Sequence, residues 1–251
     1  MLGNKRYELM FGDCLERMKE IHDGSVDMIL CDLPYGTTAC KWDVIIPFEP
    51  LWAEYRRVCK KNAAIVLTAS QPFTSALVMS NAEWFKYCWT WVKTNVTGFA
   101  NAKKQPLSVV EDVCVFYGRQ CVYNPQGVKR LDQPRVRTKD TGDIMGKTGF
   151  KDGYVQEFTD YPKNLLDVAS ERGDHPTQKP VALFEYLIRT YTNEGEVVLD
   201  NCAGSGTTGV ACANTKRLFI GIERDETYFT NAAERVMDAY AEATLKQGKQ
   251  K

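Results

Sequence analysis

The chain has 251 residues, and its 32 basic and 32 acidic side chains give a formal net charge of zero. Twelve Tyr, eleven Phe and five Trp exclude a disordered chain and suit one large domain, or one domain with a small insert. No apolar run approaches the roughly 18–20 residues that span a bilayer, and the N-terminus lacks the apolar core of a signal peptide. We therefore expect a cytosolic protein.

The nine cysteines and two histidines do not favour a metal site. No two cysteines form a C-x-x-C pair, and His22 and His175 lie far apart. Zinc sites usually take their ligands from closely spaced pairs. We expect no metal, and cysteines that act as small buried hydrophobes in a reducing compartment.

Strand and helix signals alternate in the first half of the chain. This alternation predicts an α/β fold with a mainly parallel sheet. The expected strands cover residues 27–31, 63–69, 87–92 and 112–117, and the expected helices cover 47–60 and 71–80.

Apolar periodicity fails between residue 118 and about residue 172, where glycine and proline are frequent. Such a long irregular segment is usually functional or mobile. Residues 129–139 carry five basic side chains against the single acid Asp132. Alone, this run predicts a solvated loop, and it indicates a polyanionic partner only if the chemistry elsewhere requires one.

Regular structure resumes with an expected helix at 180–191, strands at 196–200 and 217–222, and a helix at 226–245. The first of these strands leads into Gly204-Ser205-Gly206, a turn that opens a helix with free N–H groups. The next strand ends at Glu223, where a carboxylate can accept hydrogen bonds from ribose hydroxyls. This unit predicts an adenosine-containing cofactor. Because residues 204–209 also fit G-x-G-x-x-G, the unit alone leaves NAD open.

Asp32-Leu33-Pro34-Tyr35 follows the strand at 27–31. In open α/β sheets, ligands bind at this carboxyl edge of the strands. Pro34 stiffens the turn, Asp32 supplies a carboxylate and Tyr35 an aromatic face. The segment alone fits an ordinary turn with a core tyrosine equally well.

These two segments resemble motifs of the amino-group DNA methyltransferases, which modify adenine N6 or cytosine N4. Residues 32–35 resemble the catalytic D-P-P-Y motif, with Leu33 in place of a proline. Residues 199–208 resemble the cofactor motif D-P-F-x-G-S-G-T-T, with Asn201 and Cys202 replacing Pro and Phe. The catalytic motif comes first, as in the β class of these enzymes.

Three further segments are similar to that class. Residues 12–16 resemble its G-D-x-x-E segment, and residues 175–180 resemble H-x-T-Q-K-P. Residues 97–111 resemble its loop and strand on the target-base side. The five motifs stand in the order of the class and cover nearly the whole chain outside residues 119–170.

The resemblance implies a Rossmann-like, S-adenosylmethionine-dependent methyltransferase fold. Its mainly parallel seven-stranded sheet carries helices on both faces and an irregular insert. Residues 1–118 and 171–245 would form a discontinuous catalytic domain with a circularly permuted motif order. Residues 119–170 would be a target-recognition insert, and residues 246–251 a polar tail.

The implied reaction is methyl transfer from S-adenosylmethionine to N6 of an adenine flipped out of duplex DNA. Asp32 and the Leu33 carbonyl would accept hydrogen bonds from the amine, an electrostatic form of catalysis. Pro34 would shape the turn, and Tyr35 would stack on the base. An initial Asp is more usual for adenine, so cytosine N4 is the alternative. The absence of a Pro-Cys dipeptide disfavours cytosine C5 methylation.

The resemblance assigns Glu223 to the ribose hydroxyls, Asp13 to the adenine amine, and Asp200 with Thr177–Lys179 to the methionine end of the cofactor. Arg135 or Arg137 would read guanine. The full cofactor set is Asp13, Cys14, Thr177, Gln178, Lys179, Asp200, Cys202, Ala203, Gly204, Ser205, Gly206, Thr207, Thr208 and Glu223. The DNA-binding set is Lys103, Lys104, Lys129, Arg130, Arg135, Arg137 and Lys139.

The implied partner is double-stranded DNA, in the cytoplasm of a bacterial or phage-infected cell. Members of the class often dimerise, so a homodimer is open, whereas the sequence shows neither a restriction endonuclease partner nor a recognition site. An NAD-dependent oxidoreductase leaves residues 32–35 and 175–180 unexplained. Methylation of RNA or of a protein amide is a second alternative, which Asp32 disfavours. A DNA-binding module with an inactive cofactor site is a third, and the intact residues 204–206 argue against it.

Overall fold

The computed structural model describes residues 2–3, 5–38, 40, 43–137, 154–171 and 178–248. The chain forms two compact units. The larger unit comprises residues 1–124 and 164–251, and the smaller comprises residues 125–163. The smaller unit therefore lies inside the range that the sequence predicts as an insert, 119–170.

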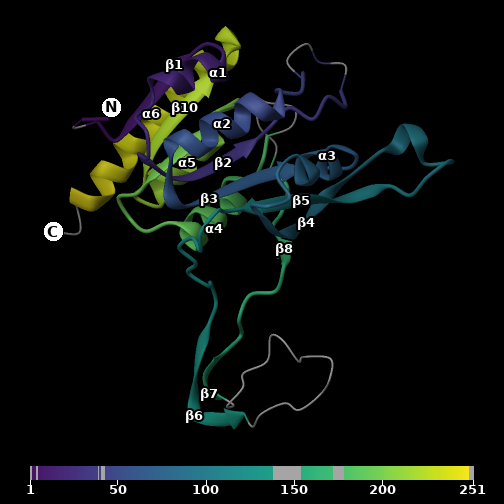
Figure 1. Ribbon diagram of the computed structural model, residues 1–251, viewed down its shortest axis with the longest axis vertical. Helices are drawn as coiled ribbons and strands as arrows, with labels where there is room; N and C mark the ends of the chain where they lie inside the picture. Colours follow the sequence, from purple (N-terminus) through teal and green to yellow (C-terminus); the bar gives the residue numbers. More distant parts are fainter. Residues whose placement is uncertain are drawn as a thin grey trace. The chain divides into compact units, whose positions relative to one another are not determined.

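The larger unit is built on an eight-stranded sheet (Figure 1). Its first five strands are parallel, the sixth is antiparallel to both of its neighbours, and the last two are parallel to each other. The order across the sheet is β1 (Tyr7–Phe11), β10 (Leu218–Glu223), β9 (Val197–Asp200), β2 (Val26–Asp32), β3 (Cys59–Ala69), β5 (Ser108–Phe116), β4 (Phe85–Thr97) and β8 (Leu165–Asp167).

The mainly parallel α/β sheet predicted from the sequence is confirmed, but it has eight strands instead of the seven that the resemblance implies. Two of the eight, β1 and β8, are not among the strands predicted from the residues, and β8 is three residues long, at the edge beside β4. It lies in the segment that we expected to be irregular, because three residues are too few to produce a recognisable alternation.

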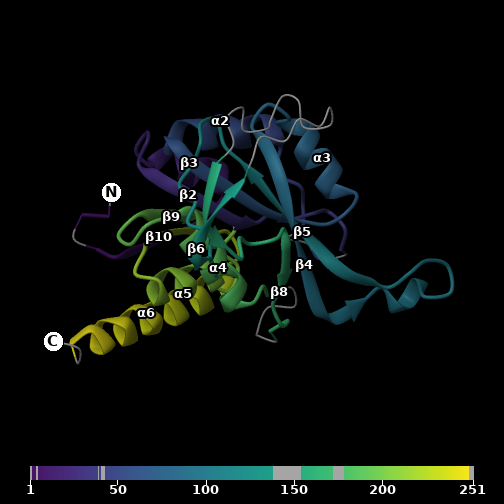
Figure 2. The same ribbon diagram turned by 90° about the horizontal axis from the view of Figure 1, so that it is seen from below.

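Helices cover both faces of the sheet (Figure 2). Apolar residues of α2 and α3 belong to one buried hydrophobic cluster, and apolar residues of α4, α5 and α6 belong to a second one. The helices are α1 (Cys14–Arg17), α2 (Phe48–Val58), α3 (Phe73–Ser80), α4 (Val181–Tyr191), α5 (Thr207–Asn214) and α6 (Glu226–Gly248), with 3-10 turns η1 (Met18–Glu20) and η2 (Phe99–Asn101).

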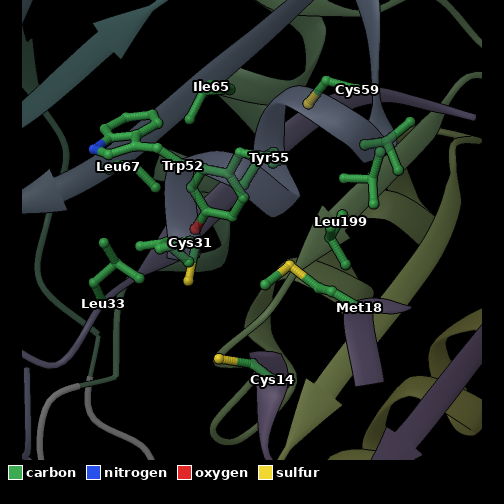
Figure 3. Packing of buried hydrophobic residues seen from close by; sticks show 14 of the residues in the cluster. Cys14, Met18, Cys31, Leu33, Trp52, Tyr55, Cys59, Ile65, Leu67 and Leu199 are labelled. Atoms are coloured by element: carbon green, nitrogen blue, oxygen red, sulfur yellow. The ribbon is translucent and has the colours of Figure 1, made fainter. Parts of the chain in front are cut away.

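The two clusters explain why the central strands read as continuous apolar runs. In β2, Ile29 and Cys31 face the first cluster, while Met28 and Leu30 face the second. Alternate side chains of a strand point to opposite faces, so a strand covered on both faces is apolar throughout. Figure 3 shows the first cluster, which also contains Leu33. No helix in the described part of the chain is long and apolar enough to cross a bilayer.

Strands β4 and β5 extend beyond the rest of the sheet as a hairpin (Figures 1 and 2). We call residues 94–110 the β4–β5 arm. Phe99, at its tip, is 69% exposed. The arm contains Lys103 and Lys104 and no acidic residue, so its surface combines positive charge with exposed apolar side chains.

The smaller unit contains an antiparallel pair, β6 (Lys129–Arg137) and β7 (Tyr154–Thr159). The expectation of irregular structure throughout this segment is therefore wrong. Its strands escape recognition because they bury no apolar face, as the exposure of Val136 and Val155 illustrates. The pairing register shifts between Arg130 and Arg135, next to Pro134, which has no N–H to donate.

Candidate active site

A cavity of about 740 Å³ opens in the larger unit, where several parallel strands end. Asp32 closes β2, Asp200 closes β9 and Glu223 closes β10, so three carboxylates reach the same edge of the sheet. The predicted site residues that line the cavity are Asp13, Cys14, Asp32, Leu33, Pro34, Tyr35, Gln178, Lys179, Asp200, Cys202, Ala203, Gly204, Ser205, Thr207, Thr208 and Glu223.

Asp32 is held by side chains from three parts of the chain. Its Oδ1 accepts hydrogen bonds from the Tyr35 hydroxyl, at 2.7 Å, and from the Thr68 hydroxyl on β3. Its Oδ2 accepts from Lys179 Nζ at 2.6 Å. The Tyr35 ring stacks on Phe73, with the ring centroids 5.1 Å apart. Asp32 therefore presents a fixed carboxylate to the cavity.

The turn after Asp32 is stabilised by a residue that the sequence analysis does not identify. Buried Asp43 accepts hydrogen bonds from the backbone N–H groups of Gly36, Thr37 and Thr38. Burial alone raises the pKa of Asp43, but a hydrogen bond from the Thr38 side chain, together with these backbone hydrogen bonds, outweighs it and holds the pKa below its ordinary value. Asp43 thus acts as an ionised anchor for the loop that follows the D-L-P-Y segment.

Leu33 differs from the proline of the resembling motif without disturbing the core. Its side chain is 4% exposed and belongs to the cluster of buried residues in Figure 3. A branched aliphatic side chain fits this apolar environment, and its burial anchors the turn between Asp32 and Tyr35.

Asp200 ties the glycine-rich turn to the end of β9. Its Oδ1 accepts from the Cys202 N–H at 3.0 Å, and its Oδ2 accepts from the Thr208 hydroxyl on α5. Burial raises the pKa of Asp200 from 3.8 to about 6, although these hydrogen bonds oppose the shift. Asp200 faces the cavity, and both of its oxygens stabilise the turn.

Contrary to the expectation from the sequence, the structure does not place Gly206 where its backbone could approach a ligand. It has a φ of +79° and is not among the residues lining the cavity. A Cβ there would lie 3.0 Å from Val236 Cγ2 and 3.2 Å from Ala232 Cα on α6. Glycine is required at this position by the positive φ and by the close packing of α6.

The Glu223 carboxylate accepts hydrogen bonds from backbone N–H groups. Its Oε2 accepts from the Gly204 N–H at 2.7 Å, and its Oε1 accepts from the N–H groups of Arg224 and Asp225 at 2.9 and 2.8 Å. Burial raises its pKa above the ordinary value, against the effect of these hydrogen bonds. A carboxylate has about four acceptor positions, so one position stays open toward the cavity.

Arg235 of α6 is a second residue that the sequence analysis misses. Its Nη1 donates to the Ser205 carbonyl at 2.8 Å and lies 3.4 Å from Gln178 Oε1, which also accepts from Ser205 Oγ at 3.0 Å. Arg235 thereby joins the glycine-rich turn to the segment before α4. No local pattern marks it, because its partners lie 30 and 57 residues away.

Cysteines form part of the cavity wall and of the core below it. Cys14 and Cys31 are buried and Cys202 is partly buried. Burial raises the pKa of Cys31 to about 12, so its thiol is neutral. Cys40 is exposed, contrary to the expectation that the cysteines are buried.

The predicted DNA-binding residues are distributed over both units. Lys103 and Lys104 are exposed on the β4–β5 arm, and Lys129, Arg130 and Arg135 are exposed on β6. Lys129 forms an ion pair with Asp160, at 3.0 Å. The backbone of Arg137 belongs to β6, whereas the side chain of Arg137, together with Lys139 and Thr177, lies outside the described residues.

Comparison with known proteins identifies the family. The DNA methylase family model for N6 and N4 enzymes matches residues 26–234. The DNA adenine methyltransferase YhdJ of Escherichia coli is 29% identical over 93% of this chain and 84% of its own length. The type II methyltransferase M.HpaI of Haemophilus parainfluenzae is 28% identical over 91% of this chain and 73% of its own length.

Solved structures agree with this result. The M1.HpyAVI–SAM complex has a TM-score of 0.64 and 26% identity, covering 92% of this chain and 98% of that chain. The cytosine-N4-specific PvuII DNA methyltransferase, at 15% identity, has a TM-score of 0.63 and covers 95% of this chain and 93% of its own, and it shows the fold alone. With the family model covering most of its length, this chain belongs to the amino-group DNA methylase family.

Proposed function

We propose that the protein transfers a methyl group from S-adenosylmethionine to N6 of an adenine flipped out of duplex DNA. The observation that carries this proposal is the Asp32 carboxylate, fixed at the carboxyl edge of the sheet in the same cavity as Glu223 and the glycine-rich turn. The name of YhdJ as a DNA adenine methyltransferase supports adenine as the target. This assignment replaces the NAD-dependent alternative.

The cofactor side of the cavity fits S-adenosylmethionine. The open acceptor position of Glu223 suits a ribose hydroxyl, and Asp13, which also caps α1 through the Leu15 N–H, suits the adenine amine. Thr207 Oγ1, at the start of α5, is buried in the cavity wall without a hydrogen-bond partner. Such an orphaned hydroxyl is expected where a polar ligand completes the site. When bound, the cofactor supplies an electrophilic methyl group on a sulfonium.

On the target side, Asp32 and the Leu33 carbonyl act as acceptors for the amine of the base. An exocyclic amine is a poor nucleophile because its lone pair is delocalised into the ring. Two acceptors that hold its protons favour a tetrahedral nitrogen with a free lone pair, and they stabilise the positive charge that develops there. Tyr35 extends its stack with Phe73 to the flipped base.

The DNA duplex is contacted by two groups of exposed cations. Lys103 and Lys104 on the β4–β5 arm hold phosphates beside the flipped base, because Thr97 and Ser108 of the same arm line the cavity. The smaller unit is the target-recognition part, and Arg130 and Arg135 on β6 contact the backbone or base edges.

The test is to incubate the purified protein with tritiated S-adenosylmethionine and unmethylated mixed-sequence duplex DNA, digest the DNA to nucleosides and identify the labelled one. Label in N6-methyladenosine is the expected result. Label in N4-methylcytosine would correct the base and keep the mechanism of positioned acceptors. Label absent from several DNAs but present on RNA or protein would overturn DNA as the substrate.

A further inference from the structure

Four charged side chains of alternating sign run from the target side of the cavity to Asp32. Lys93 Nζ on β4 lies 3.0 Å from Glu111 Oε1 on β5, and Glu111 Oε2 lies 3.4 Å from Lys179 Nζ. Lys179 Nζ then lies 2.6 Å from Asp32 Oδ2. The chain of charges links two strands of the β4–β5 hairpin to the end of β2 through the segment before α4.

Lys179 is the most buried member of this chain. Its side chain is 6% exposed, compared with 25% for Asp32 and 15% for Glu111. Burial alone lowers the pKa of Lys179, but the charges of Asp32 and Glu111 outweigh it and raise the pKa above its ordinary value. Lys179 is therefore a buried ammonium, and removing it would leave Asp32 without a cationic partner and Glu111 with Lys93 alone.

The hydrogen-bond partners of Asp32 show which of its oxygens has an acceptor position left for the substrate. A carboxylate offers about four acceptor positions, two on each oxygen. Tyr35 and Thr68 occupy Oδ1, and Lys179 takes one position of Oδ2. The remaining position is on Oδ2, the oxygen that Lys179 holds.

We propose that Lys179 is a positioning residue for the reaction, rather than a ligand of the cofactor. It orients Asp32 so that Oδ2 accepts the hydrogen bond of the target amine. As the nitrogen–carbon bond forms and the carbon–sulfur bond breaks, the amine becomes positively charged. The amine then gives one proton to solvent water, and Asp32 stays a carboxylate beside the ammonium of Lys179. This inference rests on the proposed function.

The test compares Lys179→Met and Lys179→Arg with the wild type by single-turnover methyl transfer. Loss of the ammonium should slow transfer about 100-fold or more. Arginine, which keeps a positive charge beside Asp32, should restore part of the rate. Cofactor affinity, measured by calorimetry, should stay within about threefold.

Lys179→Met and Lys179→Arg leave the other titratable groups around Asp32 unchanged, so a difference in rate between these two variants comes from position 179. Tyr35 stays neutral, because burial raises its pKa well above the ordinary value. The remaining groups near Asp32 are Cys31 on β2, Asp200 on β9, Glu111 on β5 and Lys93 on β4.

A charge-matched double variant separates positioning from structural neutralisation. Lys179→Met combined with Glu111→Gln removes one charge of each sign and leaves no second carboxylate to be neutralised. If Lys179 only neutralised Glu111, this double variant would regain the wild-type rate, and the proposal would be wrong. Continued slow transfer supports positioning, as long as the variant keeps wild-type cofactor affinity as evidence of folding.

Two further results would overturn the proposal. A parallel loss of cofactor affinity and rate in Lys179→Met would return Lys179 to the cofactor site. An unchanged rate of transfer in Lys179→Met would show that Asp32 needs no partner at Oδ2. In both cases the wild type still methylates DNA, so the proposed function survives, whereas a wild type inactive on all DNAs would overturn both.

Discussion

The two sides of the cavity hold their carboxylates with different kinds of donor. On the cofactor side, Glu223 accepts only backbone N–H groups among its described partners. On the target side, Asp32 is held by the side chains of Tyr35, Thr68 and Lys179. Backbone donors persist whatever the side chains are, so the cofactor side should tolerate substitution of its neighbours. The target side depends on specific side chains, and single substitutions there should change the chemistry.

The largest effect is expected for Asp32→Ala. Removing the acceptor should slow methyl transfer about 10²–10³-fold or more, because the developing charge on the amine loses its partner. Cofactor affinity should stay within about threefold, since Glu223 and the glycine-rich turn are untouched. Single-turnover rates and calorimetry measure the two quantities. Asp32→Asn keeps the shape and should also be slow, whereas equal losses of rate and affinity would refute the separation of the two sides.

Asp200 should make stability depend on pH. Its pKa rises from 3.8 to about 6 on folding, so the native state binds the proton more tightly than the unfolded state. The free energy of unfolding therefore falls as pH rises from about 4 to about 6, in total by about 3 kcal/mol. Asp200→Asn removes this titration. Between low and neutral pH, the free energy of unfolding of the wild type should therefore fall by about 3 kcal/mol relative to that of the variant.

Urea unfolding at several pH values measures this difference, because other titrations cancel between the wild type and Asp200→Asn. Asp238→Asn, on the exposed side of α6, is the matched control for the loss of an acidic side chain. A pH-independent difference for Asp200→Asn would mean that the Cys202 and Thr208 donors fully compensate for burial.

The parts of the fold that the sequence predicts are those with a dense local pattern. Strands β2, β3, β9 and β10 are buried on both faces, and α2 repeats apolar residues at Leu51, Trp52, Tyr55 and Val58. By contrast, β1 and β8 lie at the two edges of the sheet and β6 contains Pro134. Their side chains satisfy no single period, so the pattern that identifies a strand is absent.

The site follows the same rule. Asp32, Glu223 and the glycine-rich turn stand at strand ends, where sequence order alone places them at one edge of the sheet. The partners of these groups come from distant segments: Lys179 is 147 residues from Asp32. The resemblance assigns Lys179 to the cofactor, whereas the structure pairs it with Asp32, and no local pattern marks Asp43 or Arg235. Which donor meets which acceptor depends on packing, which no local spacing records.

An intermediate effect is expected for Glu223→Gln. Glutamine keeps the shape of the side chain but replaces one acceptor oxygen with an NH2 donor. A backbone N–H group then loses its acceptor, and the open acceptor position for the cofactor is lost as well. Loss of a charged hydrogen bond costs about 1.5–3 kcal/mol, which corresponds to cofactor affinity about 10- to 150-fold weaker. Calorimetry measures the affinity, and Glu194→Gln, on the exposed surface, is the control. An unchanged affinity would remove Glu223 from the cofactor site.

The smallest effect concerns the exposed cations. Replacing Arg130 and Arg135 together with alanine should reduce the slope of log affinity against log salt by about two and leave cofactor affinity unchanged. Lys129→Ala on the same strand should reduce the slope by less than a single arginine replacement does, because Lys129 is already paired with Asp160 at 3.0 Å. Fluorescence anisotropy of a labelled duplex at several salt concentrations measures both. If Lys129→Ala weakens binding as much as Arg130→Ala, the ion pair does not persist on DNA, and the basic strand acts through its total charge rather than through individual side chains.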